Sequence, residues 1–178
     1  MLTAQTLHRA GHWSGAAQTC KLDYTQRFLR RKKLTTEEGT DFLADLVHTT
    51  SLDHDDALEL SDGTLVRIVA AEESLARITG PDLTRLAWHV GNRHTPCQIA
   101  GDHLLIQSDP VIEHMLEHLG ARVETVTAPF TPEGGAYGHG RTHSHEHGAT
   151  AHSHSHTHSH GDGHSHSHSH SHSHSHDH

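Results

Sequence analysis

The sequence predicts an α+β protein, in which a small β-rich N-terminal domain precedes a ferredoxin-like βαββαβ domain and a disordered histidine-rich tail. Three observations lead to this fold class. Short apolar runs separated by turn residues fill the first part of the chain. Two stretches with apolar residues at helical spacing follow, and the chain ends in a nearly regular His-Ser repeat. We therefore place the domain boundaries at 1–71, 72–140 and 141–178.

Four short apolar runs indicate strands in the first domain, and tight turns separate them. Asp62-Gly63 is a strong two-residue hairpin signal between the last two runs. Several short strands of this kind favour a small sandwich or a partial barrel. The four runs are Lys21–Arg31, Thr40–Val47, Ala57–Leu60 and Thr64–Ala70.

A basic cluster interrupts this domain. It consists of Arg27 and the run Arg30-Arg31-Lys32-Lys33. The simpler interpretation is the solvated face of a strand, because charged side chains commonly protect exposed strands. The alternative is a docking patch for an acidic partner.

The second domain opens with a strand at Ser74–Thr79. Pro81 suits the first turn of a following helix, and Gly91 is placed to terminate that helix as the residue after its cap. Between Pro81 and Gly91, apolar residues recur at helical spacing, which predicts one buried face. Ile99–Gln107 has the composition of strands, with a break at Gly101-Asp102. The residues of the buried face are Leu83, Leu86, Ala87 and Val90.

The second helix begins at Asp109, which is a good N-cap, with Pro110 in its first position. Gly120 ends it, and Arg122–Thr127 forms the last strand, which completes a βαββαβ order. Pro129–Gly140 is rich in proline and glycine and is typical of a linker into the tail. The buried stripe is predicted at Val111, Ile112, Met115, Leu116 and Leu119.

Composition excludes several classes of function. The net charge is −9 for the whole chain and −6 for residues 1–142, which argues against a nucleic-acid partner. No apolar run approaches the ~18 residues that a membrane span needs. Two cysteines without a CxxC pair, and a start without a signal peptide, fit a cytoplasmic protein.

The segment His143–His178 contains 16 of the 26 histidines, and its largest aliphatic residue is alanine. Such a segment cannot bury enough apolar surface to offset the entropy lost on ordering, so we expect disorder. Dense imidazoles predict binding of divalent metals, although an expression tag and a pH-responsive polyelectrolyte are weaker alternatives. The candidate ligands are His143, His145, His147, His152, His154 and His156, with the remaining tail histidines to His178 as auxiliary ligands.

A family resemblance becomes specific at Trp88-His89-Val90-Gly91-Asn92-Arg93-His94. This run resembles the signature of the UreE urease accessory proteins, a family of nickel metallochaperones. Asp109–Leu116 is similar to the second helix of that family, and Pro129–Gly140 is similar to the segment before its histidine-rich tail. The first domain resembles the family more loosely, through Tyr24–Leu46 and the Asp-Gly hairpin.

The resemblance implies a function, a main site and partners. His94 matches the essential metal ligand, which two subunits of a homodimer share at their two-fold axis. The implied cargo is Ni²⁺, with Zn²⁺, Cu²⁺ and Co²⁺ as further candidates, and the implied partners are the urease accessory GTPase and apo-urease. We expect no enzymatic activity, since no HExxH, nucleophile elbow or phosphate loop occurs. The alternative function is a general buffer or store for divalent metals.

The remaining candidate residues are less certain ligands. His139 lies in the predicted linker and could join His94, whereas Cys97 fits a small buried residue better than a ligand. His114 and His118 have a spacing that can bind metal on a helix, but their acidic neighbours favour a solvated face. His89 fits packing or support of the signature. Surface positions are expected for His8, His12, His48, His54 and His103. Some members of the family carry additional histidines just before the second helix, and this sequence departs from that pattern with Ser108 and Pro110, so the resemblance does not extend to a peripheral metal site there.

Overall fold

The computed structural model describes residues 1–134 of the chain. The predicted disorder of the tail, His139 and the tail histidines from His143 to His178 therefore lie outside the described residues. Within residues 1–134, no helix is long and apolar enough to span a membrane.

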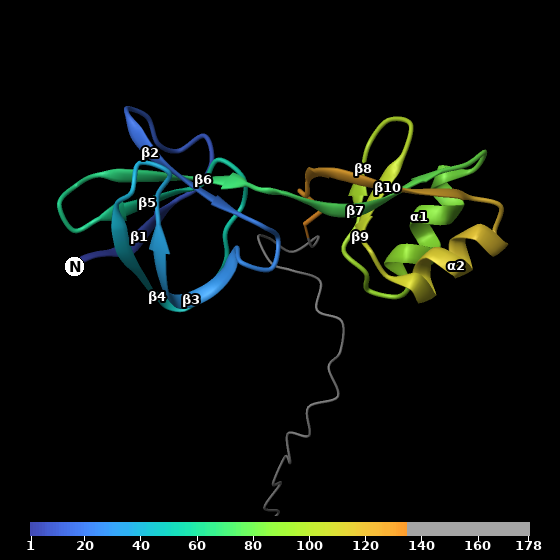
Figure 1. Ribbon diagram of the computed structural model, residues 1–178, viewed down its shortest axis with the longest axis horizontal. Coiled ribbons are helices and arrows are strands. Elements are labelled where there is room, and N and C mark those ends of the chain that lie inside the picture. Colours follow the sequence, from blue (N-terminus) through green and yellow to red (C-terminus); the bar gives the residue numbers. More distant parts are fainter. Residues whose placement is uncertain (135–178) are drawn as a thin grey trace, which may run out of the picture. The chain divides into compact units, whose positions relative to one another are not determined.

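Six strands form a curled sheet in the first part of the chain (Figure 1). Their order across the sheet is β2-β6-β5-β1-β4-β3, and the pairs β1–β4 and β2–β6 are parallel. The chain just after β3 reaches back to β2, where the Glu37 N–H donates to the Thr19 carbonyl over 2.8 Å. This curl agrees with the predicted partial barrel. The strands are β1 Leu2–His8, β2 Ala17–Leu22, β3 Phe28–Thr35, β4 Asp41–Ser51, β5 Ala57–Leu60 and β6 Leu65–Ala70.

Two of these strands were not predicted. Strand β1 was missed because only Ala4 along it is fully buried, so no alternating apolar pattern marks it. The predicted single strand Lys21–Arg31 is wrong: a turn divides it into β2 and β3. In this turn the Asp23 carboxylate accepts the Gln26 N–H over 2.7 Å, a side-chain contact that stabilises turns.

Arg27 corrects the interpretation of the basic cluster as a uniformly solvated face. Its side chain is 2% exposed, and its guanidinium group donates to the carbonyl of Phe130. Burial lowers the pKa of this guanidinium group. On β3, by contrast, Arg31 and Lys33 are exposed and pair across the strands with Asp45 at 3.7 Å and Asp41 at 2.9 Å. The cluster is therefore one buried anchor followed by an exposed basic strand.

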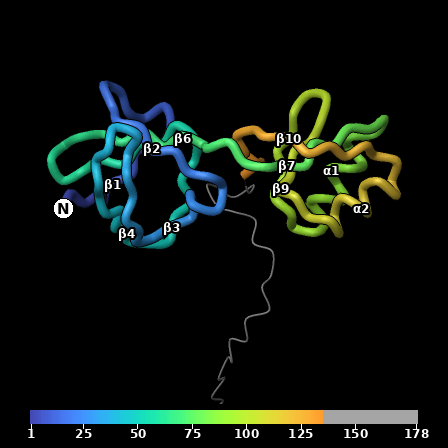
Figure 2. Tube along the Cα trace, in the orientation of Figure 1, coloured from blue at the N-terminus to red at the C-terminus, as the bar shows by residue number. Residues whose placement is uncertain are grey.

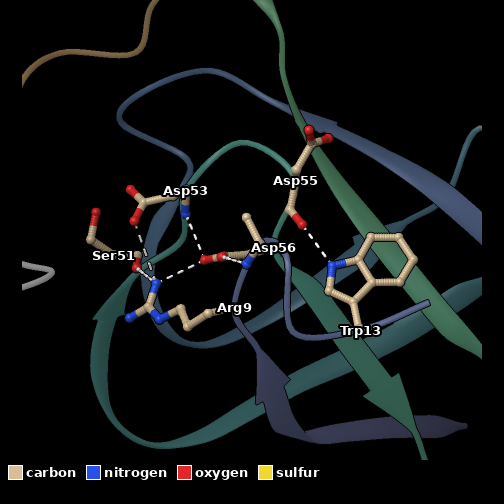
Figure 3. A network of polar contacts seen from close by, with 7 residues as sticks. Arg9, Trp13, Ser51, Asp53, Asp55 and Asp56 are labelled. Atoms are coloured by element: carbon tan, nitrogen blue, oxygen red, sulfur yellow. Dashed lines mark hydrogen bonds and ion pairs between the residues drawn. The ribbon is translucent and has the colours of Figure 1, made fainter.

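A buried carboxylate organises the loop after β1 (Figure 3). Asp56 is 1% exposed and accepts hydrogen bonds from Arg9, from the Ala10 N–H and from the Asp53 N–H. Three donors satisfy a buried charge that would otherwise be costly. The indole N–H of Trp13 donates to the Asp55 carbonyl over 2.7 Å, which ties the loop to the turn before β5.

The second part of the chain has the predicted βαββαβ order. Its four antiparallel strands lie in the order β10-β7-β9-β8, and β7 and β10 pair along their whole length (Figure 2). Both helices cover one face of this sheet, where Leu86, Val90 and Leu116 meet Ile78 and Ile106 (Figure 1). The elements are β7 Glu72–Thr79, α1 Leu83–Gly91, β8 Gln98–Ile99, β9 Leu104–Gln107, α2 Pro110–His118 and β10 Arg122–Pro129.

The start of α1 and the buried face of α2 both differ from the prediction. Asp82 is the N-cap of α1 and accepts the Arg85 N–H, so Pro81 precedes the helix and does not belong to its first turn. Val111 was predicted in the buried stripe of α2 but is 77% exposed. It lies next to Ile112 on the helix, about 100° around the axis, so the two cannot share a narrow buried face.

The start of the predicted linker is ordered and packed. Pro129 is the last residue of β10, and Phe130 is fully buried. The Phe130 ring contacts the Tyr24 ring edge-on at 5.1 Å and packs with Leu75 and Leu105. The prediction of a linker from Pro129 is therefore wrong for its first residues, because the Phe130 side chain packs into a buried cluster.

Candidate metal centre

His94 lies in the turn that terminates α1. The His94 N–H donates to the Gly91 carbonyl at 2.9 Å, and the Thr95 N–H donates to the Val90 carbonyl at 3.4 Å. These two bonds have the pattern of a Schellman motif in which His94 occupies the left-handed position. Its φ of 56° is in the left-handed region, as that position requires.

This geometry corrects the prediction that Gly91 ends the helix in the glycine position. Gly91 is the last residue of α1, and the left-handed position that usually holds glycine is occupied by His94. A left-handed conformation costs a residue with a Cβ roughly 1–2 kcal/mol. Strained non-glycine residues of this kind are concentrated at functional sites. The strain therefore points to a role for the imidazole that glycine could not fill.

The rest of the signature builds this turn. The Asn92 N–H donates to the Trp88 carbonyl at 2.9 Å, and the Arg93 guanidinium donates to the His89 carbonyl at 3.1 Å. Arg93 thus places a positive charge at the negative end of the helix dipole. His94 itself is exposed at the resulting corner, where a second molecule could approach it. The Arg93 side chain therefore stabilises the end of the helix, whereas Asn92 contributes through its backbone N–H.

An exposed aromatic side chain precedes the corner. Trp88 is 63% exposed, and its ring stands edge-on to the ring of His89 at 5.0 Å. Large exposed aromatic residues are typical of protein interfaces. His89 is half-buried on the same turn of α1, which agrees with its expected supporting position.

Cys97 has the character of a packing residue. It is half-buried against the core beneath the two helices, and burial raises the pKa of its thiol to about 11. Metals bind the thiolate, and a pKa this high leaves very little thiolate at neutral pH. The Cys97 thiol is therefore protonated at neutral pH in the metal-free protein, and a bound ion would lower its pKa.

The chain that leads to the tail is attached to the segment after His94. The Glu133 N–H donates to the Cys97 carbonyl at 2.8 Å, and the Thr131 N–H donates to the side-chain oxygen of Gln98 at 2.8 Å. Thr131 and Glu133, near the end of the described residues, are therefore held at the segment that follows His94. The sequence does not reveal this attachment, because Thr131 lies in the segment predicted as a linker and Gln98 belongs to no recognisable motif.

The described residues contain no complete metal site within one chain. Across residues 1–134, no group of three or more His, Cys, Asp or Glu side chains could hold an ion. His94 is thus not brought together with Cys97, His89 or His103 into a closed cluster. A site of three or more protein ligands at His94 would need ligands from a second chain or from outside residues 1–134.

Comparison with known proteins identifies relatives along the whole chain. A family model described as UreE urease accessory protein, N-terminal domain, matches residues 2–71, and the model for the C-terminal domain of the same protein matches residues 73–178.

Individual relatives are closely similar. A urease accessory protein UreE from Ruegeria pomeroyi is 60% identical over 136 residues, which cover 76% of this chain and 91% of that protein. The UreE of Cereibacter sphaeroides is 58% identical over 140 residues, or 78% of this chain and 76% of the relative. The UreE of Beijerinckia indica is 48% identical over 141 residues, covering 77% of this chain and 82% of the relative.

Proposed function

Because this chain belongs to the family of UreE urease accessory proteins, we propose that it is a nickel metallochaperone, which collects Ni²⁺ and delivers it for assembly of the urease active site. Membership of the family makes it an accessory protein of urease maturation. Nickel as the cargo, and delivery as the action, are the proposal.

The observation that carries the proposal is the left-handed conformation of His94 at an exposed corner. A lone imidazole holds a divalent ion weakly. Two copies of His94 across a two-fold axis would form a chelate from one sequence position. Two protein ligands leave coordination positions open, so the ion can leave more easily than from a closed tetrahedral site. Release is what delivery needs.

The attachment at Cys97 and Gln98 supports a route from the tail to His94. These hydrogen bonds hold Thr131 and Glu133 beside the segment that follows His94, and His139 comes six residues after Glu133 in the sequence. A short tether raises the effective concentration of tail-bound ions at a nearby site. We assign His139 and the tail histidines from His143 onward the role of collecting ions, and His94 the role of presenting one ion.

The partners follow from this role. The exposed Trp88 next to the corner supports a homodimer that meets around His94. The accessory GTPase and apo-urease would receive the ion from that dimer. Two free cysteines, Cys20 and Cys97, support a reducing compartment such as the cytoplasm. We propose a binding protein without catalytic activity of its own.

The competing function is a general buffer for Ni²⁺, Zn²⁺ or Co²⁺. A buffer needs only the imidazoles of the tail, and it gives no reason for a strained histidine in the folded part. The two functions differ in which residues matter. A buffer depends on the number of tail histidines, whereas a chaperone depends on His94.

Urease activation at limiting nickel tests the proposal. Apo-urease with its accessory proteins is activated with the wild-type chain, with His94→Ala and with His48→Ala, a control at another exposed histidine. We expect His94→Ala to activate poorly, the control to match the wild type, and excess nickel to restore activation. Equal activation by His94→Ala at limiting nickel would favour the buffer.

A further inference from the structure

A second pair of imidazoles lies on α2, away from the signature. His114 and His118 are four residues apart on the same exposed face of the helix, and the ring centroids are 4.3 Å apart. Side chains at this spacing are neighbours on a helix surface. The pair contributes nothing to the core, since Ile112 and Leu116 form the buried face of α2.

The hydrogen bonds of the pair determine which ring nitrogens can bind an ion. The Nδ1 atom of His118 lies 3.1 Å from the carbonyl oxygen of His114. A carbonyl oxygen only accepts, so Nδ1 carries the proton and Nε2 keeps its lone pair in the neutral ring. Metal-binding histidines characteristically donate their other ring N–H to a carbonyl or a carboxylate in this way.

His114 has a similar environment. Its Nδ1 atom lies 4.0 Å from the Glu117 carboxylate, and its side chain is 73% exposed. This separation is longer than a hydrogen bond, so the carboxylate does not determine which ring nitrogen carries the proton. The nearby negative charge attracts a cation to the helix surface. His118 is therefore prepared to bind through Nε2, and the neutral ring of His114 has a nitrogen lone pair for the same ion.

We propose that His114 and His118 form a second metal site, a two-histidine chelate on the surface of α2 for a borderline divalent ion such as Zn²⁺, Ni²⁺ or Cu²⁺. Imidazole nitrogen is a preferred ligand of these ions, and hard cations such as Mg²⁺ prefer oxygen. With two protein ligands, water completes the coordination shell and the ion exchanges readily. The site goes beyond the proposed function, because it depends only on the geometry of α2 and not on delivery to urease.

Hydrogen exchange of the full chain, measured by mass spectrometry on peptides covering α2, tests the site with Zn²⁺ as the probe. An ion that bridges one turn of the helix suppresses its local opening by a factor of 1 + [Zn²⁺]/Kd. At free zinc ten times Kd, the amides of the last turn should exchange about tenfold more slowly. Peptide resolution separates this effect from ions bound by the tail or by His94.

Two variants and a control complete the test. His118→Gln and His114→Gln each remove one ligand and should each abolish the zinc-dependent slowing, whereas His48→Gln should retain it. Both replaced side chains are exposed, so the helix should still form. The proposal is overturned if wild-type α2 shows no slowing at saturating zinc, or if either variant slows as much as the wild type. Loss of urease activation in His94→Ala has no bearing on this result.

Discussion

At the scale of single residues, His94 is held in a conformation that its own side chain disfavours. The turn after α1 requires a left-handed residue, and glycine would satisfy it at no steric cost. The chain therefore gives up stability at this position for an imidazole. Such an exchange is common where a side chain has a function that packing does not supply.

His94→Gly should raise the free energy of unfolding by about 1 kcal/mol, because glycine adopts the left-handed conformation without the Cβ penalty. His94→Ala should leave it nearly unchanged, since alanine has the same penalty. Both variants lose the imidazole and should lose the same metal site. Urea denaturation of the metal-free proteins measures the difference. A His94→Gly protein that is less stable than His94→Ala would show that the turn does not have this conformation.

At this scale, sequence reasoning singled out His94 as the candidate ligand but did not predict the geometry of its turn. The family resemblance of the signature selected His94. Gly91 then misled the placement of the turn, since a glycine near a helix end is the usual left-handed residue. Only the hydrogen bonds of His94 and Thr95 show that the helix includes Gly91 and turns three residues later.

At the scale of elements, α2 and β5 were predictable from local signals, namely apolar runs with capping or turn residues beside them. β5 at Ala57–Leu60 has the predicted bounds, and α2 begins with the predicted Asp109 cap and Pro110. β1 was not predictable, because it is stabilised by pairing with β4 and β5 and not by an apolar pattern of its own. The burial of Arg27 depends on Phe130, which is about a hundred residues away.

The segment after β10 has a structural role that its composition conceals. Phe130 is fully buried between Tyr24, Leu75 and Leu105, and its carbonyl accepts from Arg27. This residue joins the end of β10 to the turn between β2 and β3. The chain toward the tail thus leaves from an anchored position and not from a free linker.

Phe130→Ala should lower the free energy of unfolding by about 3–5 kcal/mol, because it leaves a cavity in a buried cluster. Phe28→Ala is a matched control: Phe28 is 37% exposed, so the same change should cost much less. Urea denaturation of the two variants and the wild type measures both effects. Equal losses for Phe130→Ala and Phe28→Ala would mean that residues after β10 do not anchor the chain.

At the scale of the whole molecule, the proposed roles of holding many ions and presenting one ion fall on different parts of the chain. The tail has 16 of the 26 histidines but no residues for a core, while residues 1–134 have a core but no group of three or more side chains that could hold an ion. In the proposed function, the tail collects nickel, and His94 is the position where an ion from the tail is presented.

Nickel titration of a chain that ends at Gly140, with and without His94→Ala, tests directly whether two copies of His94 share one ion. Both proteins carry His118→Gln, so that the pair on α2 does not contribute. With His94 intact, we expect one tightly bound nickel ion per two chains, since two symmetry-related imidazoles would form the chelate. With His94→Ala, that ion should be lost. If the His94→Ala protein retains one nickel ion per two chains with unchanged affinity, His94 is not the shared ligand, and Cys97 or His139 becomes the leading candidate for it.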